Sequence, residues 1–261
     1  MRTIKLLLAY DGTDFCGWQK QDVPLANSNL DACERLGQRT VQATVESALE
    51  QMHHHPVAVI GAGRTDSGVH AAGQVASFQT DIESIKHERF VPALNGLLPQ
   101  DVRILEASEA CIDFHARFDA RSRTYRYNCI CCRHALPHES RYALQLWRYP
   151  DIALLNAYCR DILGERDCSI FAGAGDSSKS RNRYISRAAF FYDGSCLIFE
   201  ISANAFLWKM VRSIAGTFLH YEERNTPPSQ LFEIIASGDR SFAGPTLPPH
   251  GLFLWKVDYF R

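Results

Sequence analysis

The chain has 261 residues, of which 46% are hydrophobic and 22% are charged, and its formal net charge is -1. This length allows one large domain or two smaller ones, and the near-neutral charge excludes a protein whose whole surface is basic, although a local basic patch can still bind nucleic acid. Because no apolar run approaches the roughly 20 residues of a membrane span and no signal-peptide pattern is visible, we expect a cytoplasmic protein without membrane association.

The first part of the chain has the hydrophobic periodicity of a strand-helix-strand-strand-helix-strand order. The strands are expected at residues 3–10, 56–60, 74–78 and 102–106. One helix is expected to begin after Thr40, which can cap it, and a second one to span 89–97. One face of the first helix is apolar and consists of Val41, Val45, Ala48, Leu49 and Met52. Residues 22–39 are polar and mixed, and we expect a loop or an insertion there.

The second part repeats this order with one extra helix and no visible sequence repetition. Strands are expected at residues 123–132, 184–192, 196–202 and 252–259, and helices at 151–164, 206–221 and 229–236. Asp193-Gly194 is typical of a hairpin turn. The pattern predicts an α+β fold with antiparallel sheets, divided near residues 107–112 into halves 1–108 and 109–261. No low-complexity linker separates the halves, which favours a rigid pair.

The run from Gly61 to His70 is the most informative stretch, because it places charged residues between glycines and between two expected strands. A loop held between two strands can fix a reactive carboxylate such as that of Asp66. Arg64 keeps its charge and can bind a phosphate or another carboxylate. Taken alone, the run also fits a glycine-rich turn with a solvated aspartate and arginine.

Two basic stretches contain aromatic residues. The first contains Arg117, Arg121, Arg123, Arg126 and Arg133 with Phe118, Tyr125 and Tyr127. The second contains Lys179, Arg181, Arg183 and Arg187 around Tyr184. Arginine neutralises phosphates and aromatic rings stack on unpaired bases, so both stretches fit an RNA-binding surface. Two solvated strand faces explain the same pattern equally well.

The nine cysteines are odd in number and scattered, which favours reduced thiols over a secreted disulfide framework. The run from Cys129 to His134 raises a zinc hypothesis. It lacks a second ligand pair, however, and successive strand residues point to opposite faces. His53-His54-His55 lies at a predicted helix end and fits a polar terminus. We therefore expect no metal site.

Six blocks of the chain carry a resemblance to a known family. They lie at residues 9–21, 63–70, 113–118, 123–127, 203–212 and 251–254. In this order and at these separations they resemble the tRNA pseudouridine synthase A (TruA) family over nearly the whole chain. The resemblance implies two ferredoxin-like (RRM-like) halves whose antiparallel sheets join across a central active-site cleft. It also implies a homodimer that acts on uridines 38, 39 and 40 in the anticodon stem-loop of tRNA.

The reaction of this family makes modest chemical demands. It breaks the bond from C1′ to N1, turns the uracil, and joins C5 to C1′. Nothing is oxidised and no group is imported, so no cofactor is needed. Cleavage leaves an electron-poor sugar that one adjacent carboxylate can stabilise or trap, whereas a glycosidase usually needs two carboxylates. The single candidate Asp66 fits the first requirement.

The resemblance assigns roles residue by residue. It makes Asp66 the nucleophile and Arg212 its ion-pair partner, and it places Tyr125 against the target uracil. Arg64 would fill the stack left by the extruded base, because the reacting atoms are hidden in a stem. Without the resemblance, Arg212 fits a surface Lys/Arg face and Tyr125 fits a half-buried strand tyrosine.

Other candidates carry less specific roles. Asp11, Gly17, Trp18 and Gln19 match a block near the site, although Asp11 and Asp14 also fit turn formers. Arg121, Arg123 and Arg183 are the expected contacts to the RNA.

The chain departs from the family pattern at a few positions. Ser67 stands where alanine is usual, Trp208-Lys209 replaces an aromatic residue or histidine followed by histidine, and 22–39 resembles an insertion. Two rival functions remain. A non-catalytic RNA-binding protein would not need Asp66, and a base-removing hydrolase would release free uracil.

Overall fold

The computed structural model describes residues 1–20 and 39–259, which form an α+β structure of two compact units. The first unit holds Met1–Arg121 together with the stretch that begins at Leu254, and the second holds Ser122–Phe253. This differs in two places from the expected halves 1–108 and 109–261. The strand that ends the first half continues to Ala110, which pairs with Thr3, and the last strand of the chain returns to the first unit.

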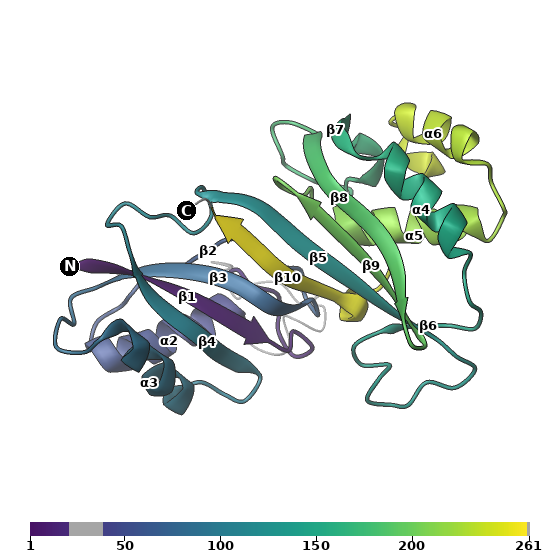
Figure 1. Ribbon diagram of the computed structural model, residues 1–261. Coiled ribbons are helices and arrows are strands. Elements are labelled where there is room, and N and C mark those ends of the chain that lie inside the picture. The colour runs from purple at the N-terminus through teal and green to yellow at the C-terminus, as the bar shows by residue number, and fades with distance from the viewer. Residues whose placement is uncertain (21–38, 260–261) are drawn as a thin grey trace, which may run out of the picture. The chain divides into compact units, whose positions relative to one another are not determined.

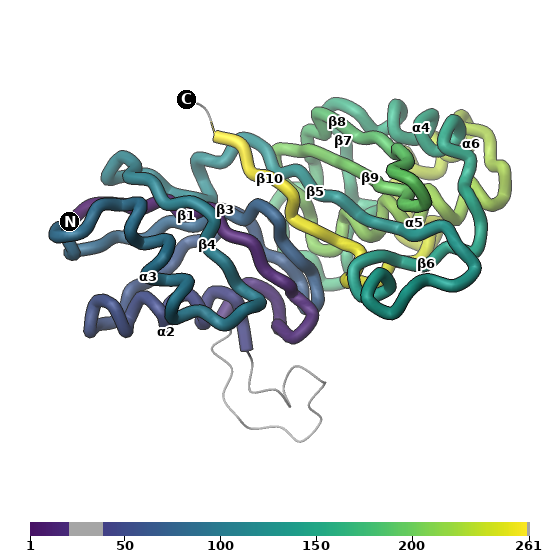
Figure 2. The backbone as a smooth tube through the Cα atoms, turned by 60° about the horizontal axis from the view of Figure 1, so that its bottom comes forward, coloured from purple at the N-terminus to yellow at the C-terminus, as the bar shows by residue number. Residues whose placement is uncertain are grey.

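The first unit contains an antiparallel sheet with two helices on one face. Its strands are β1 (Arg2–Tyr10), β2 (Ile60–Gly61), β3 (His70–Thr80), β4 (Val102–Ala110) and β10 (Leu252–Tyr259), and its helices are α2 (Val41–His53) and α3 (Phe90–Leu97). The sheet order is β4-β1-β3-β10, with β2 paired to β3 outside this path. Figures 1 and 2 both show α2 and α3 side by side on the same side of this sheet.

Helix α2 begins as predicted, because the Thr40 side chain accepts a hydrogen bond from the Ala43 amide. Its buried face differs at one position, where His53 is buried and Met52 is only half-buried. The Nδ1 and Nε2 atoms of His53 each lie 2.8 Å from an oxygen, of Leu49 and Thr80 respectively. Because both ring nitrogens have partners, His53 is a core residue, and the expected polar helix terminus is wrong for it.

The strand predicted at residues 56–60 is reduced to the short β2. Side chains of α2 occupy the backbone groups of Val59 that a sheet neighbour would use. The Val59 amide donates to Glu46 Oε1 at 3.1 Å, and Gln42 Nε2 donates to the Val59 carbonyl at 3.1 Å. The helix therefore takes this segment out of the sheet.

The second unit contains the sheet strands in the order β5-β9-β8-β7, and β6 pairs in parallel with β5. Its strands are β5 (Ala120–Cys131), β6 (Leu144–Leu146), β7 (Gly164–Asp167), β8 (Asn182–Asp193) and β9 (Cys196–Ala203). Its helices are α4 (Ile152–Asp161), α5 (Met210–Glu222) and α6 (Pro228–Ala236). The rings of Tyr158, Phe190, Phe199 and Phe218 join α4 and α5 to β8 and β9 in one buried aromatic cluster.

A buried carboxylate ties the end of α5 to the start of α4. Glu222 is only 5% exposed and accepts hydrogen bonds from both terminal nitrogens of Arg148. Its Oε1 also accepts from the Asp151 amide at 2.7 Å, while the Asp151 side chain caps α4 as predicted. The charge of Glu222 is thus paired and fully hydrogen-bonded, which burial requires.

Helix α5 starts later than its periodicity predicts, at Met210 and not near Phe206. The Trp208 amide donates to Asp176 Oδ2, and the Trp208 carbonyl accepts from the Gly173 amide at 2.8 Å. Lys209 then adopts a left-handed conformation with φ of 60°. Because these backbone groups bond to the loop after β7, Phe206 and Lys209 lie outside the helix that was expected to span 206–221.

Among the described residues, seven cysteines have free thiols, and burial raises the pKa of the buried ones, Cys129, Cys131, Cys159 and Cys168. A raised pKa makes these thiols unreactive. Cys16 is disulfide-bonded, so the expectation of reduced thiols is wrong there. An odd total of cysteines does not decide the state of any one of them. Within residues 1–20 and 39–259, no helix combines the length and apolar character that crossing a bilayer requires.

Candidate active site

Asp66 lies on a tight turn between β2 and β3, as the sequence predicts. The Asp66 carbonyl accepts a hydrogen bond from the Val69 amide at 3.1 Å, and Gly68 has a φ of 74° that closes the turn. The Asp66 side chain is half-buried. Ser67, where the family usually has alanine, adds a hydrogen bond of 3.3 Å to the Phe15 carbonyl. The turn thus presents Asp66 on a backbone with its own internal bonds.

The segment that follows β1 clasps this turn. The Trp18 amide donates to the Thr65 carbonyl at 3.1 Å, and the Gly68 amide donates to the Phe15 carbonyl at 3.2 Å. Gly17 has a φ of +87°, and a Cβ atom on it would lie 2.4 Å from the Thr65 oxygen. Only glycine fits there, because both conformation and space exclude a side chain. The sequence blocks 9–21 and 63–70 therefore form one structure.

Gly12 and His70 join the far ends of these two blocks. Asp11 Oδ1 accepts from the amide and the hydroxyl of Thr13, at 3.0 and 2.6 Å, and lies 3.1 Å from His70 Nδ1. The same His70 nitrogen accepts from the Gly12 amide at 3.0 Å. Asp11 is therefore a turn former, as its residue type favours, and the bond from the Gly12 amide to His70 links this turn to the start of β3.

A buried glutamine holds the other side of the Asp66 turn. Gln74 is fully buried on β3, and its Nε2 donates to the Gly63 carbonyl at 2.8 Å. At Gly61, an added Cβ would lie 2.4 Å from the Trp18 ring. His70 and Gln74 were not predicted as supports of the turn. Buried polar residues at a strand end leave no periodic signal, so only their tertiary partners identify them.

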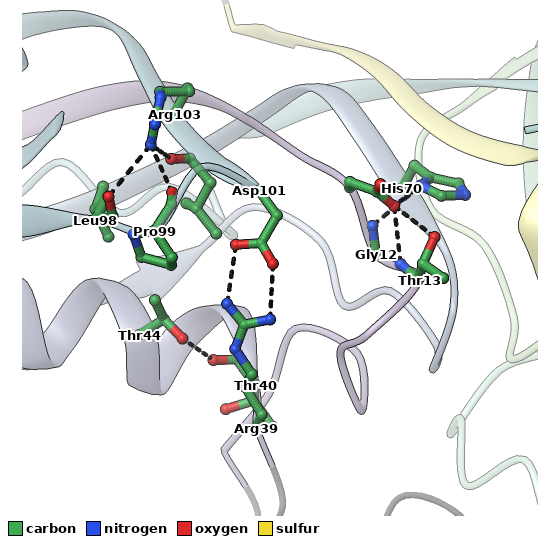
Figure 3. Close-up of polar contacts among 12 residues, drawn as sticks. Gly12, Thr13, Arg39, Thr40, Thr44, His70, Leu98, Pro99, Asp101 and Arg103 are labelled. Atoms are coloured by element: carbon green, nitrogen blue, oxygen red, sulfur yellow. Dashed lines mark hydrogen bonds and ion pairs between the residues drawn. The ribbon is translucent and has the colours of Figure 1, made fainter. Parts of the chain in front are cut away.

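Arg39 joins the residues that precede α2 to the block 9–21. Its guanidinium makes two hydrogen bonds of 2.7 and 2.9 Å to Asp101 (Figure 3). The guanidinium carbon also lies 4.0 Å from the centroid of the Phe15 ring. Backbone bonds of 2.8, 3.2 and 3.0 Å join residues 16–18 to residues 39–42: Cys16 to Arg39, Val41 to Gly17 and Gln42 to Trp18. Residues 22–38 of the expected insertion lie outside the described residues.

Arg64 is exposed two residues before Asp66. Partial burial of its guanidinium lowers the pKa of Arg64, and the charge of Arg117 lowers it further. Arg117 comes from the block 113–118, so the charge of this block acts on the loop that carries Asp66. Two like charges that interact at an exposed position favour an anionic ligand.

In the second unit, Tyr125 lies on β5 opposite Ile201 and is 7% exposed. Its ring meets the Phe206 ring edge-on, with centroids 5.1 Å apart and an interplanar angle of 84°. Tyr125 is thus more buried than the half-buried strand tyrosine that its sequence position predicts. Phe206, which lies before the helix that was expected to include it, fixes the orientation of this ring.

Arg212 does not lie on a solvated helix face. It is half-buried on α5, and its Nε donates to the Leu247 carbonyl at 2.6 Å. Burial lowers the pKa of His250, and the positive charge of Arg212 lowers it further. Burial raises the pKa of Tyr127, and the charge of Arg212 opposes this rise. The surface reading of Arg212 is therefore wrong, because the segment near Leu247 covers this side of the helix.

The basic strands of the second unit are partly neutralised from within. Glu200, 6% exposed on β9, pairs with Arg126 at 2.8 Å and with Arg187 at 3.4 Å. Because Glu200 lies between two guanidiniums, the net positive charge that can attract phosphates is smaller than the number of arginines suggests. Arg126 and Arg187 in the two basic stretches therefore have an acidic partner within the second unit.

The three arginines expected to contact RNA have different surroundings. Arg121 is exposed, and Arg123 donates to the Asn204 carbonyl at 2.8 Å. Arg183 is half-buried and donates to the carbonyls of Ser180 and Asn182, at 2.9 and 2.6 Å. Arg183 therefore has an intramolecular role that its sequence position does not reveal.

The described residues contain no group of three or more His, Cys, Asp and Glu side chains placed to hold a metal ion. In the cysteine-rich run, Cys129 and Cys131 are buried in β5. Of the three consecutive histidines, His55 is paired to Asp81 at 3.1 Å and His54 ends α2 in a left-handed conformation.

Comparison with known proteins identifies the class. A family model described as tRNA pseudouridine synthase matches residues 7–119 and 158–260, which together cover most of the chain. The chain therefore belongs to the tRNA pseudouridine synthase family, whose members are isomerases that act on uridine in tRNA.

Named relatives agree with this placement. A tRNA pseudouridine synthase A of Treponema denticola is 49% identical over 258 residues, which cover 99% of this chain and 93% of the relative. The protein of the same name from Treponema pallidum (strain Nichols) is 47% identical, covering 96% of this chain and 85% of the relative. That of Caldicellulosiruptor saccharolyticus is 37% identical, covering 99% and 100%.

Proposed function

We propose that the protein isomerises uridine to pseudouridine at positions 38, 39 and 40 in the anticodon stem-loop of tRNA. Asp66 is the nucleophile, and no cofactor takes part. Family membership supports the reaction, and the block resemblance supports the anticodon arm. The observation that carries the proposal is the turn that contains Asp66. Hydrogen bonds from residues 10–18 and from the buried Gln74 hold this turn in place.

A carboxylate held this way suits the chemistry. When the bond from C1′ to N1 breaks, the sugar becomes electron-poor, and Asp66 stabilises or traps it. The uracil turns, C5 joins C1′, the C5 proton leaves, and N1 takes up a proton, so the product is an isomer of the substrate. Because the carboxylate must stay in place while the base turns, a rigid turn serves better than a mobile loop.

The other site residues take the roles that the resemblance supplies. Arg212 is the ion-pair partner of Asp66, and its partial burial supports this role because a solvated arginine would bind a carboxylate weakly. Tyr125 packs against the target uracil, with its ring oriented by Phe206. Arg64 fills the stack when the base is extruded, and its exposure beside the turn supports this.

The surrounding surface and assembly complete the proposal. Arg121, Arg123 and Arg183 contact the tRNA, with Arg121 the best placed because it is exposed. We propose ferredoxin-like halves joined across an active-site cleft, supported in the first unit by the sheet order β4-β1-β3 with β2 beside β3. The resemblance also supports a cytoplasmic homodimer.

Product analysis of treated tRNA tests the function. The protein is incubated with a transcript labelled with tritium at C5 of uridine, and tritium release and digested nucleosides are measured. Release together with pseudouridine at positions 38–40 is expected, and a transcript with cytidine at these positions should give none. Free uracil would identify a base-removing hydrolase, and bound but unchanged tRNA a non-catalytic binder.

A further inference from the structure

The turn after β4 presents an exposed aromatic ring in a fixed stack. Phe118 is 76% exposed, and its ring is stacked on that of His115, with centroids 4.2 Å apart and an interplanar angle of 27°. The guanidinium carbon of Arg117 lies 5.9 Å from the centroid of the Phe118 ring. A single exposed ring is common on protein surfaces, and what distinguishes this one is the ring stacked beneath it and the adjacent guanidinium.

Backbone bonds hold this turn without using the Phe118 ring. The His115 amide donates to Asp119 Oδ2 at 2.8 Å, and the Asp119 amide donates to the His115 carbonyl at 3.1 Å. The Nδ1 atom of His115 accepts from the amides of Arg117 and Phe118, both at 3.2 Å. The His115 ring is thereby fixed as a base for the ring of Phe118.

The sheet of the first unit anchors the turn from below. The Ala116 amide donates to Ser77 Oγ on β3 at 3.2 Å, and the Tyr259 hydroxyl on β10 donates to the Ala116 carbonyl at 2.6 Å. A ring mounted on such a turn loses little conformational freedom when a ligand stacks on it.

Positive charge accompanies the ring. Arg117 is exposed beside it, and its charge acts on Arg64, which precedes Asp66 by two residues. The charge of Arg117 thus acts both at the stacked pair and at the loop that carries Asp66. Aromatic rings with adjacent arginines are the combination by which proteins bind single-stranded nucleic acid, since every base has a π-face and every nucleotide a phosphate.

We propose that the Phe118–His115 pair is a docking site for an unpaired base of the substrate tRNA, with Arg117 binding the adjacent phosphate. This rests on the proposed function, because it assumes an RNA substrate. The cationic surroundings favour a polyanion over an apolar protein partner, which would have to bury two arginines. The site is distinct from that of the reacting uridine, so it adds affinity and orientation without taking part in the chemistry.

Binding measurements on the full-length protein test this site. The dissociation constant for a tRNA transcript is measured by fluorescence anisotropy for the native chain, F118A, F118W and the control F242A, an exposed phenylalanine of the second unit. F118A should raise the dissociation constant roughly 5- to 100-fold, the loss expected for one base-aromatic stack. F118W should bind at least as tightly as the native chain, and F242A should match it.

Two further readouts separate stacking from other roles. F118A should leave the salt dependence of binding unchanged. R117Q should reduce the slope of log affinity against log salt concentration by the amount expected for about one phosphate contact. Single-turnover rates at saturating tRNA should stay within about twofold of the native rate for F118A. Circular dichroism should show a native fold, because the ring makes none of the bonds that hold the turn.

Opposite results would overturn the proposal. F118A binding as tightly as F242A would exclude a stacked base. If sedimentation showed that F118A changes the oligomeric state of the protein, the ring would belong to a protein interface instead. A native chain that binds tRNA through Phe118 without isomerising it would contradict the proposed function but not this site.

Discussion

The hydroxyl oxygens of Tyr10 and Thr65 lie 2.8 Å apart in the interior of the first unit, where both residues are less than a tenth exposed. Tyr10 ends β1, and Thr65 immediately precedes Asp66. The last residue of the strand thus bonds directly to the neighbour of the proposed nucleophile. Removal of the Tyr10 hydroxyl is therefore expected to change the rate of the reaction.

Tyr10→Phe removes this bond and should lower the free energy of unfolding by about 1 kcal/mol. It should also lower kcat, because the turn that carries Asp66 loses one support. Tyr221→Phe is the control, since it removes a bond of equal length, 2.8 Å, to the Phe242 carbonyl in the second unit. Urea unfolding and tritium release measure the two effects. Equal kcat values for both variants would contradict the role given to Tyr10.

Gly17→Ala should inactivate the enzyme, because the new Cβ would collide with the Thr65 carbonyl and displace the Asp66 turn. Gly164→Ala is a matched control. Gly164 has a φ of +88°, close to the +87° of Gly17, but nothing lies within 4 Å of its added Cβ. The control should lose only the roughly 1 kcal/mol of left-handed strain. Thermal unfolding and kcat are measured for both variants. Backbone strain affects both, whereas the collision and the loss of kcat should affect only Gly17→Ala.

Asp66→Asn should abolish isomerisation while leaving folding and tRNA affinity nearly intact, because the amide keeps the shape of the carboxylate but is not a nucleophile. Asp113→Asn, at an exposed position, makes the same change of charge and should keep native turnover. Tritium release at saturating tRNA checks both variants. Substantial turnover by Asp66→Asn would remove Asp66 from the mechanism.

Arg212→Ala should cost more activity than Arg212→Lys, which keeps the charge. A carboxylate that loses a cationic partner binds its proton more readily, so the acid limb of the activity profile should move to higher pH in Arg212→Ala. Arg224→Ala, just beyond α5, is the control and should keep the native profile. An unshifted acid limb in Arg212→Ala would exclude the ion pair with Asp66.

Charge reversal should separate Arg121 from Arg183. Arg121→Glu should weaken tRNA binding and flatten its salt dependence, because a phosphate contact and its counterion release are lost. Arg183→Glu should also weaken binding, and in addition it should lower stability, since the guanidinium donates to the carbonyls of Ser180 and Asn182. Binding titrations at several salt concentrations and urea unfolding test these effects. Native affinity and salt slope in both variants would place the RNA on another surface.

Sequence reasoning succeeded where local chemistry decides the structure. Thr40 and Asp151 cap α2 and α4 as predicted, because a cap depends on the next three residues alone. It failed at the start of α5, where the Trp208 amide bonds to Asp176, more than thirty positions away in the chain. No periodic pattern records such a bond.

The same division holds at the candidate site. The turn of Asp66 could be recognised because its glycines and charges are consecutive in the sequence. Its supports could not, since Tyr10, His70 and Gln74 act through contacts between separate segments. Arg183 shows the converse, because its place in a basic run predicts an RNA contact while its bonds return to its own loop.

The backbone bonds between residues 16–18 and 39–42 have an evolutionary consequence. Together with the pair of Arg39 and Asp101, they close the chain below the segment that separates the two blocks. The entropic cost of closing a segment between such bonded ends rises only slowly with the length of the segment. Lineages can therefore lengthen, shorten or replace this segment while the turn of Asp66 keeps its geometry. The stem uncouples diversification of the enzyme from its catalysis, and it marks where a foreign domain could be grafted.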